Sequence, residues 1–231
     1  MNHPIFFFEN IPSENVITLD EDTSKHVVQV LRMKPAEQLQ LTDGKGSLVT
    51  VEIIDDHKKK CSVKVVERNF IDKKNQHVSI AISLLKTVSR FEWFLEKATE
   101  IGVTEIIPLL CSRTEKQHFR YDRMQQILIS AMMQSKQFWL PVLHEPVSFA
   151  KAIASNQYST KLLAHCGEED KTSVADFRHN TSVQIFIGPE GDFTKEEIAA
   201  ALAAGFQPVT LGNTRLRAET AGVVAATVLC I

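Results

Sequence analysis

The sequence predicts an α/β domain with a mainly parallel sheet, preceded by a small barrel of short strands. Three observations lead to this fold class. Beyond residue 76, apolar runs of strand length alternate with segments of helical periodicity, the pattern of a parallel sheet covered by helices. Before residue 72, short strand-like runs separated by polar turns surround one helical segment. The polar stretch 72–75 reads as a linker, so we predict domains at 1–72 and 73–231.

In the N-terminal region, local patterns account for each predicted element. The predicted strands are 4–8, 38–42, 47–54 and 61–67. The second and third flank Asp43-Gly44-Lys45-Gly46, where glycine permits the positive φ of a tight turn, so they predict a hairpin. Residues 22–32 carry valines and a leucine at helical spacing behind a polar start, which predicts a helix.

The C-terminal region contains five predicted strands and four predicted helices. The strands are 78–85, 103–110, 161–165, 183–187 and 208–211. Ser89 is the predicted cap of the first helix, the second spans 122–135, the third opens at Thr194, and the fourth spans 218–229. Gly102 ends the first helix at a position that favours a left-handed residue. Thr194 and Glu197 form a capping box, in which the hydroxyl and the carboxylate accept hydrogen bonds from each other's backbone amides.

Composition excludes several classes of protein. The apolar fraction of 44% is enough for a packed core, and no apolar run approaches the roughly 18 residues that cross a bilayer. The start of the chain reaches Glu9 without a basic segment, unlike a signal peptide. Single cysteines at 61, 111, 166 and 230 match neither a zinc site nor a dense disulfide framework. We therefore expect a reduced, cytoplasmic protein without a metal.

Charge points to a local patch. The formal net charge is −2, so a nucleic-acid partner would have to bind a local group of cations. One such group lies between residues 113 and 136 and consists of Arg113, Lys116, Arg120, Arg123 and Lys136. On charge alone, a solvated helix face is the commoner explanation of such a group.

Two glycine-bearing segments follow predicted strands and precede predicted helices. They are 187–193 and 211–220. Ligands of parallel α/β sheets bind at the carboxyl ends of the strands, where such loops lie. Neither segment is a Walker A loop or a dinucleotide fingerprint, and Pro189 removes one amide that a phosphate would need. The loops therefore suit a ligand without phosphates, such as adenine, although by pattern alone such glycine turns are more often plain connections.

The two segments together resemble a known family. IGPEG at 187–191 and LGNTRLRAETA at 211–221 are similar to the paired motifs of the RsmE family of small-subunit ribosomal RNA uridine-N3 methyltransferases, in the SPOUT superfamily. Residues 26–32, 94–103 and 134–141 resemble further family segments in the same order, so the likeness covers almost the whole chain. Asp192 stands where the family has a second glycine, and Gln137 where many members carry arginine.

This resemblance implies a fold and a cofactor. The fold would be a SPOUT-type parallel sheet with a C-terminal trefoil knot, preceded by a PUA-like β-barrel for RNA recognition. The cofactor would be S-adenosyl-L-methionine. The residues implied to hold it are Leu163, His165, Gly188, Pro189, Glu190, Gly191, Leu211, Gly212, Leu216 and Arg217. The resemblance also implies a homodimer, for which the apolar final helix would suit either an interface or an ordinary core.

The implied reaction directs attention to cations. N3 of uridine carries a proton, so a fixed cation near the uracil carbonyls would favour its loss. Arg217 is our first candidate for this catalytic role and Arg215 our second. The residues expected to bind RNA are Arg32, Arg113, Lys116, Arg120, Arg123 and Lys136.

The expected partner is 16S ribosomal RNA or the assembled small subunit, with no membrane. Two alternatives remain open at this point. One is a SPOUT methyltransferase that acts on tRNA. The other is a ribosome-assembly protein that binds RNA without catalysis.

Overall fold

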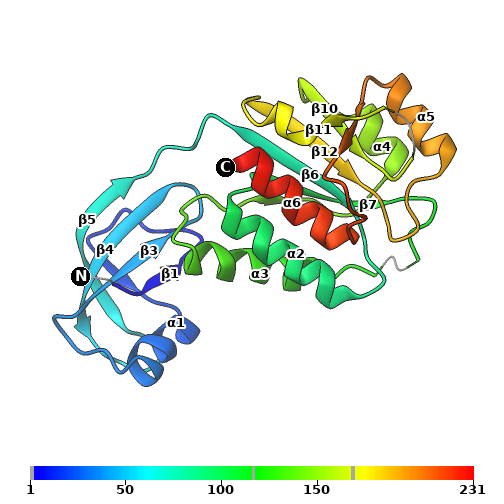
Figure 1. Cartoon of the computed structure of the whole chain (residues 1–231). Coiled ribbons are helices and arrows are strands. Elements are labelled where there is room, and N and C mark those ends of the chain that lie inside the picture. The colour runs from blue at the N-terminus through cyan, green and yellow to red at the C-terminus, as the bar shows by residue number, and fades with distance from the viewer. Residues whose placement is uncertain (1–2, 116–117, 168–169) are drawn as a thin grey trace. The chain divides into compact units, whose positions relative to one another are not determined.

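The computed structural model describes residues 3–115, 118–167 and 170–231 (Figure 1). Within this part of the chain, two compact units are formed. The first comprises residues up to Lys73 together with Met132–Leu140, and the second comprises Lys74–Ala131 and Pro141–Ile231. The first unit thus takes in a later segment that the predicted boundary at 72–73 does not include.

The first unit is built on a five-stranded sheet in the order β1-β3-β4-β5-β2. Its strands are β1 (Ile5–Phe7), β2 (Val16–Thr18), β3 (Gln38–Thr42), β4 (Ser47–Asp55) and β5 (Ser62–Phe70). The β3–β4 hairpin confirms the predicted one, whereas β2 was not predicted. The sheet curves as a half-barrel around a core to which β2, β3, β4 and β5 contribute buried aliphatic side chains.

The predicted helix at 22–32 is replaced by two shorter elements. Helix α1 (Glu21–Lys25) is capped by Asp20, whose carboxylate accepts from the Thr23 amide at 2.9 Å. A π-helix, η1 (His26–Val30), follows directly. Its wider turn is closed by the Leu31 amide on the His26 carbonyl at 2.9 Å. Because a π-turn holds an extra residue, the apolar stripe rotates outward, and Val30 and Leu31 are 67% and 43% exposed.

Residues 132–140 belong to the first unit because they pack on the β3–β4 turn. The Gly46 amide donates to the Phe138 carbonyl, and the Leu140 amide donates to the Gly44 carbonyl, both at 2.8 Å. The Trp139 indole N–H donates to the Ile71 carbonyl at 2.8 Å. Gly46 has φ +98°, and a Cβ there would lie 2.7 Å from the Trp139 ring. The predicted turn therefore needs glycine for its backbone and also for this close approach.

The second unit contains an eight-stranded sheet whose strand pairs are all parallel, as predicted. Its main order is β11-β13-β10-β12-β6-β7-β8, with β9 beside β7. The strands are β6 (His77–Ser83), β7 (Glu105–Leu110), β8 (Val142–Leu143), β9 (Val147–Ser148), β10 (Thr160–Ala164), β11 (Thr172–Ser173), β12 (Ser182–Ile187) and β13 (Gln207–Thr210).

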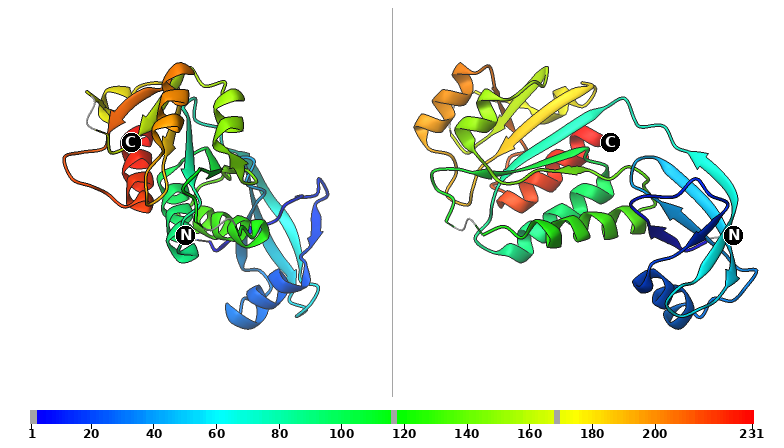
Figure 2. Two further views of the ribbon diagram at one scale, coloured as in Figure 1. Left: turned by 90° about the vertical axis from the view of Figure 1, so that its right-hand side faces the viewer. Right: turned by 180° about the vertical axis from the view of Figure 1, so that it is seen from behind.

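Helices cover both faces of this sheet (Figures 1 and 2). They are α2 (Val88–Ile101), α3 (Tyr121–Gln134), α4 (Phe149–Ala154), the 3₁₀ turn η2 (Val174–Phe177), α5 (Lys195–Ala203) and α6 (Ala218–Cys230). Helices α2 and α6 pack together on one face, and α4 and α5 on the other. The Thr194–Glu197 capping box and the left-handed Gly102 are confirmed. The cap of α2 is Thr87, so the prediction of Ser89 was wrong.

Gly222 of α6 packs against Phe94 of α2, and it gives a test of this packing. A Cβ at Gly222 would lie 2.6 Å from the ring of the fully buried Phe94. Gly→Ala inside a helix normally stabilises by about 1 kcal/mol. Here we expect Gly222→Ala to lower the free energy of unfolding by about 1–3 kcal/mol, because the core is overpacked. Urea unfolding measures it. Exposed Thr227→Ala is the control, and a stabilised Gly222→Ala protein would contradict the packing.

Candidate functional site

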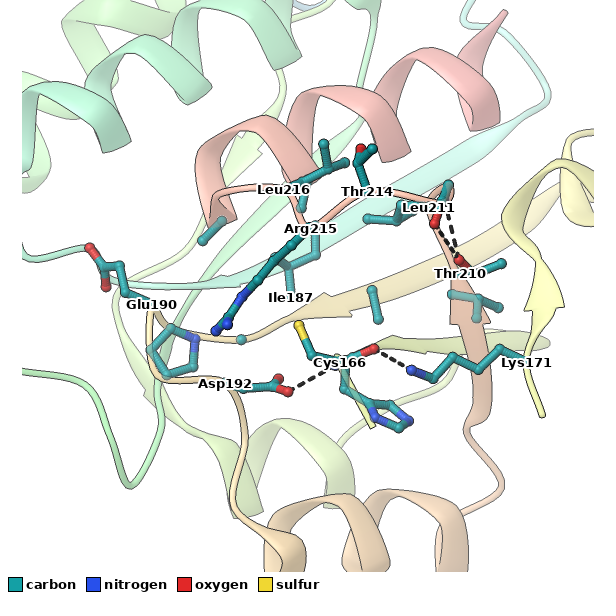
Figure 3. A pocket seen from close by; sticks show the side chains of 18 of the residues that line it. Cys166, Lys171, Ile187, Glu190, Asp192, Thr210, Leu211, Thr214, Arg215 and Leu216 are labelled. Atoms are coloured by element: carbon teal, nitrogen blue, oxygen red, sulfur yellow. Dashed lines mark hydrogen bonds between the residues drawn. The ribbon is translucent and has the colours of Figure 1, made fainter. Parts of the chain in front are cut away.

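A pocket of about 430 Å³ opens at the carboxyl ends of β13, β10 and β12, three adjacent strands of the parallel sheet (Figure 3). Three loops and the start of α6 enclose it. Its lining comprises Ala164, His165, Cys166, Lys171, Ile187, Gly188, Pro189, Glu190, Asp192, Val209, Thr210, Leu211, Gly212, Asn213, Thr214, Arg215, Leu216, Ala218 and Ala221. Both glycine-bearing motifs therefore meet at one site, as ligand binding in a parallel sheet requires.

Two side chains form hydrogen bonds with the backbone of the loop after β10. Lys171 Nζ donates to the carbonyl oxygens of His165 and Gly167, at 2.5 and 2.6 Å. The Gly167 amide donates to His165 Nδ1 at 3.1 Å. His165 is 8% exposed, so its ring forms a buried wall. These contacts hold the described part of the loop beside the pocket.

The loop after β12 is fixed by Asp192. Its Oδ2 accepts from the Cys166 amide at 2.8 Å and so joins this loop to the loop after β10. Its Oδ1 accepts from the Phe193 amide at 2.9 Å, while its own amide donates to the Pro189 carbonyl at 2.9 Å. Asp192 has φ +63°, a conformation that favours glycine. Asp192 thus adopts a backbone conformation that would suit glycine better. In return, its carboxylate forms a hydrogen bond that joins the two loops.

Two charged side chains hold this loop through hydrogen bonds. Glu190 is among the residues that line the pocket, but its carboxylate points outward in Figure 3, where its Oε1 accepts from the Lys86 amide at 3.1 Å. Arg113 Nη1 donates to the Gly191 carbonyl at 2.6 Å. Both therefore support the loop from outside.

The loop after β13 carries the two candidate catalytic arginines in different positions. Gly212 has φ +136°, and its amide and carbonyl both bond Thr210 Oγ1, at 3.3 and 2.9 Å. Arg215 lines the pocket, and its side chain extends across it toward Asp192 (Figure 3). Arg217 is exposed and is the N-cap residue of α6. It lies between Leu216 and Ala218, which both line the pocket.

The structure brings together most of the residues expected to hold a cofactor. His165, Gly188, Pro189, Glu190, Leu211, Gly212 and Leu216 all line the pocket. Leu163 is fully buried in the core between the sheet and α4. Gly191 and Arg217 border the lining residues without being among them in the described structure. The sequence did not predict that Lys171 and Asp192 hold the pocket loops in place. Lys171 lies in no recognisable motif, and Asp192 bonds Cys166, which is far away in sequence.

The described cations that were expected to bind RNA are divided between the two units. Arg123 makes a two-pronged ion pair with Glu92, and this guanidinium holds the pKa of Glu92 below its usual value. Arg120 is exposed and lines a hollow of about 370 Å³ together with Arg123. Arg32 and Lys136 belong to the first unit. Lys116 lies outside the described residues.

Two further findings concern the part of the chain that the structure describes. It contains no group of three or more His, Cys, Asp or Glu side chains that could hold a metal ion. None of its helices combines the length and the hydropathy needed to span a membrane.

Comparison with known proteins identifies the class of protein to which the chain belongs. Residues 72–230 match a family described as an RNA methyltransferase domain, and residues 19–66 match one described as an RNA methyltransferase PUA domain. The fold and the pocket are thus those of an RNA methyltransferase with a PUA domain. Within this class, the chain belongs to the family of ribosomal RNA small subunit methyltransferase E. A Synechocystis protein of that name is 32% identical over 92% of this chain and 72% of its own length.

Solved structures agree with this assignment. A Porphyromonas gingivalis protein described as a probable rRNA-methyltransferase is 36% identical, covers 98% of both chains and superposes with a TM-score of 0.91. A ribosomal RNA small subunit methyltransferase E from Neisseria gonorrhoeae, bound to S-adenosyl methionine, is 29% identical with a TM-score of 0.86. It covers 97% of this chain and 95% of its own.

Proposed function

We propose that this protein transfers the methyl group of S-adenosyl-L-methionine to N3 of a uridine in 16S ribosomal RNA. The observation that carries the proposal is the convergence of both family motifs on one pocket at three adjacent strand ends. The names of the relatives and the cofactor in the Neisseria structure support the same activity.

The pocket fits this cofactor in size and chemistry. Its volume of about 430 Å³ lies in the usual range for small-molecule sites. Ile187, Val209, Leu211 and Leu216 supply apolar surface for a purine, and the glycine-rich backbone exposes amides and carbonyls to its polar edge. When bound, S-adenosyl-L-methionine supplies an electrophilic methyl group. The residues of the pocket bind and orient it and exclude water from one side.

The target atom defines what the remaining residues must do. N3 lies on the pairing edge of uracil, so the base must be unpaired when it reaches the site. Loss of the N3 proton leaves negative charge on the ring, which a fixed guanidinium at the pocket mouth would stabilise. We assign this role first to Arg217 and second to Arg215. Glu190 is not assigned as a base, because its carboxylate already accepts the Lys86 amide.

Calorimetry and methyl transfer together test the proposal. Isothermal titration with S-adenosyl-L-methionine should show binding, which an RNA-binding protein without catalysis would lack. Labelled methyl should then enter 16S RNA rather than tRNA, and mass spectrometry should find the product as 3-methyluridine. Assays on naked 16S RNA and on assembled small subunits identify the substrate. Label in tRNA alone would favour the related tRNA enzyme.

Three finer proposals accompany this function. We propose that the parallel sheet contains a C-terminal trefoil knot, a proposal supported by the packing of 188–192 and 211–216 around one pocket.

We also propose that the protein forms a homodimer, although Ala221, Ala225 and Leu229 of α6 are buried in this chain's own core. Light scattering tests it. We place the reaction in the cytoplasm, where ribosomal RNA would be met.

Arg120 and Arg123 should contribute differently to RNA binding. The salt dependence of the RNA affinity should reveal this difference. We expect Arg120→Ala to reduce the slope of log affinity against log salt by about 0.7–0.9, the value of one phosphate contact. Arg123→Ala should change it less, because Arg123 is already paired with Glu92. Filter binding across a salt series measures both, with exposed Lys195→Ala on α5 as control. Equal slopes for all three variants would leave Arg120 a solvated surface residue.

A further inference from the structure

A second hollow lies entirely within the first unit, and nothing in the proposed reaction uses it. We call it the Leu31 groove. It has a volume of about 440 Å³ and is formed by Ile5, Leu31, Met33 and Met133, with His3 and Lys136 among its lining residues. With Pro4, which also lines it, the surface combines five apolar side chains with two that can carry positive charge. This size is typical of sites for small ligands and too small for a packed helix.

The local backbone places apolar side chains at this groove, where they are exposed to solvent. The π-helix η1 turns Leu31 outward, so that it is 43% exposed and not part of the adjacent core. π-Helices are rare and are found frequently at functional sites. The exposed Val30 lies beside it, at 67%. A regular α-helix over the same residues would have kept this stripe in the core.

Two basic residues at the groove hold a backbone conformation that favours glycine. Lys136 has φ +55° just after α3, where its amide bonds the Met133 carbonyl and the Gln137 amide bonds the Met132 carbonyl. This is the hydrogen-bond pattern of a helix end that usually carries glycine. Arg32, between the lining residues Leu31 and Met33, has φ +56°. Of the four such non-glycine residues in the described chain, Lys136 lines this groove, Arg32 is adjacent in sequence to two of its lining residues, and Asp192 lines the cofactor pocket. Strain of this kind concentrates at functional sites.

We propose that the Leu31 groove binds one unpaired nucleotide of the RNA substrate, outside the cofactor pocket. The inference rests on the proposed function. Unpaired bases present an apolar face and an anionic phosphate, which match the apolar floor and the basic residues Arg32 and Lys136. Methylation at N3 needs an unpaired uridine, and a second unpaired nucleotide near it in the RNA is the occupant that this groove would take. A nucleotide held here fixes the register of the RNA on the protein.

Methionine methyl groups allow binding to be observed directly. Met33 and Met133 line the groove, whereas Met124 lies in the second unit, at the hollow lined by Arg120 and Arg123, and reports separately any binding there. The full chain, labelled with ¹³C-methyl methionine and saturated with S-adenosyl-L-methionine, is titrated with UMP, CMP, AMP and GMP. At least one nucleotide should shift Met33 and Met133 but not Met124. Ribose 5-phosphate, which has the charge but no base, should shift them much less.

Variants then tie the shifts to the groove. Leu31→Ala should weaken nucleotide binding roughly three- to tenfold and raise KM for RNA without lowering kcat. Ile54→Ala is the matched control, because Ile54 is 46% exposed in the same unit and lies outside the groove lining. Lys136→Gly should weaken nucleotide binding without lowering thermal stability, since glycine suits φ +55°. A purely structural role of Lys136 would not lower affinity.

Several results would overturn the proposal. These are no shift with any nucleotide, an equal shift with ribose 5-phosphate, and equal weakening by Ile54→Ala. Binding of nucleotides by a wild-type protein that methylates no RNA would contradict the proposed function while supporting the groove. Failure of one inference is therefore separable from failure of the other.

Discussion

Arg217→Ala should reduce the rate of RNA methylation at saturating cofactor by about 10²–10³, the usual effect of losing one preorganised group that stabilises developing charge. Cofactor affinity should change little, because Arg217 is exposed at the start of α6 and is not among the pocket-lining residues described. Single-turnover transfer of labelled methyl measures the rate. Arg217→Lys should recover only part of it, since an ammonium lacks the planar donor pair. Higher pH should partly rescue the alanine variant, because hydroxide then helps to ionise N3.

Arg215→Ala is the matched comparison on the same loop. Its side chain extends across the pocket, so its loss should weaken cofactor binding more than Arg217→Ala does (Figure 3). If Arg215→Ala instead lowers the rate and leaves cofactor affinity intact, the order of our two catalytic candidates is reversed. If neither variant lowers the rate, an electrostatic role for this loop is contradicted.

Asp192→Ala should weaken binding of S-adenosyl-L-methionine by about 10–100-fold, equivalent to about 1.5–3 kcal/mol for one hydrogen bond to a charged group. The bond concerned joins Asp192 Oδ2 to the Cys166 amide and ties two walls of the pocket together. Without it, the loop after β10 must be ordered when the cofactor binds, which costs affinity. Isothermal titration measures the change.

Two replacements separate this tie from backbone strain at φ +63°. Asn at 192 tolerates the left-handed conformation and keeps one acceptor oxygen, so Asp192→Asn should bind nearly as well as the wild type. Asp192→Gly suits the backbone and should leave the free energy of unfolding unchanged while still losing affinity. A glycine variant with wild-type affinity would show that the tie has no role in binding.

Most of the fold could be predicted from periodicity, and the exceptions have physical causes. Strands of the sheet center, such as β6 and β12, are buried on both faces and therefore appear as continuous apolar runs. Strands of two or three residues, such as β2, β8 and β11, are too short to show alternation. The π-helix was missed because its sequence has ordinary helical spacing.

The candidate site was predictable only where it depends on local motifs. The two glycine-bearing segments located two of its three loops, because turns at strand ends need glycine locally. Lys171 and Asp192 act through bonds to the backbone at His165, Gly167 and Cys166, which no local pattern reveals. Arg113 was expected to face RNA, and it bonds the Gly191 carbonyl. The sequence of a basic stretch does not predict which group each charged side chain will bond in the folded protein.

The docking of residues 132–140 on the Gly44–Gly46 turn has a consequence for how the protein is made. The first unit cannot close when Lys73 leaves the ribosome, because Phe138 and Trp139, which bond Gly46 and Ile71, are not yet translated. At about 5–20 residues per second, the nascent half-barrel waits for several seconds with this edge unfilled. During that time β6, α2, β7 and α3 emerge. Completion of the first unit is thereby timed by synthesis of part of the second.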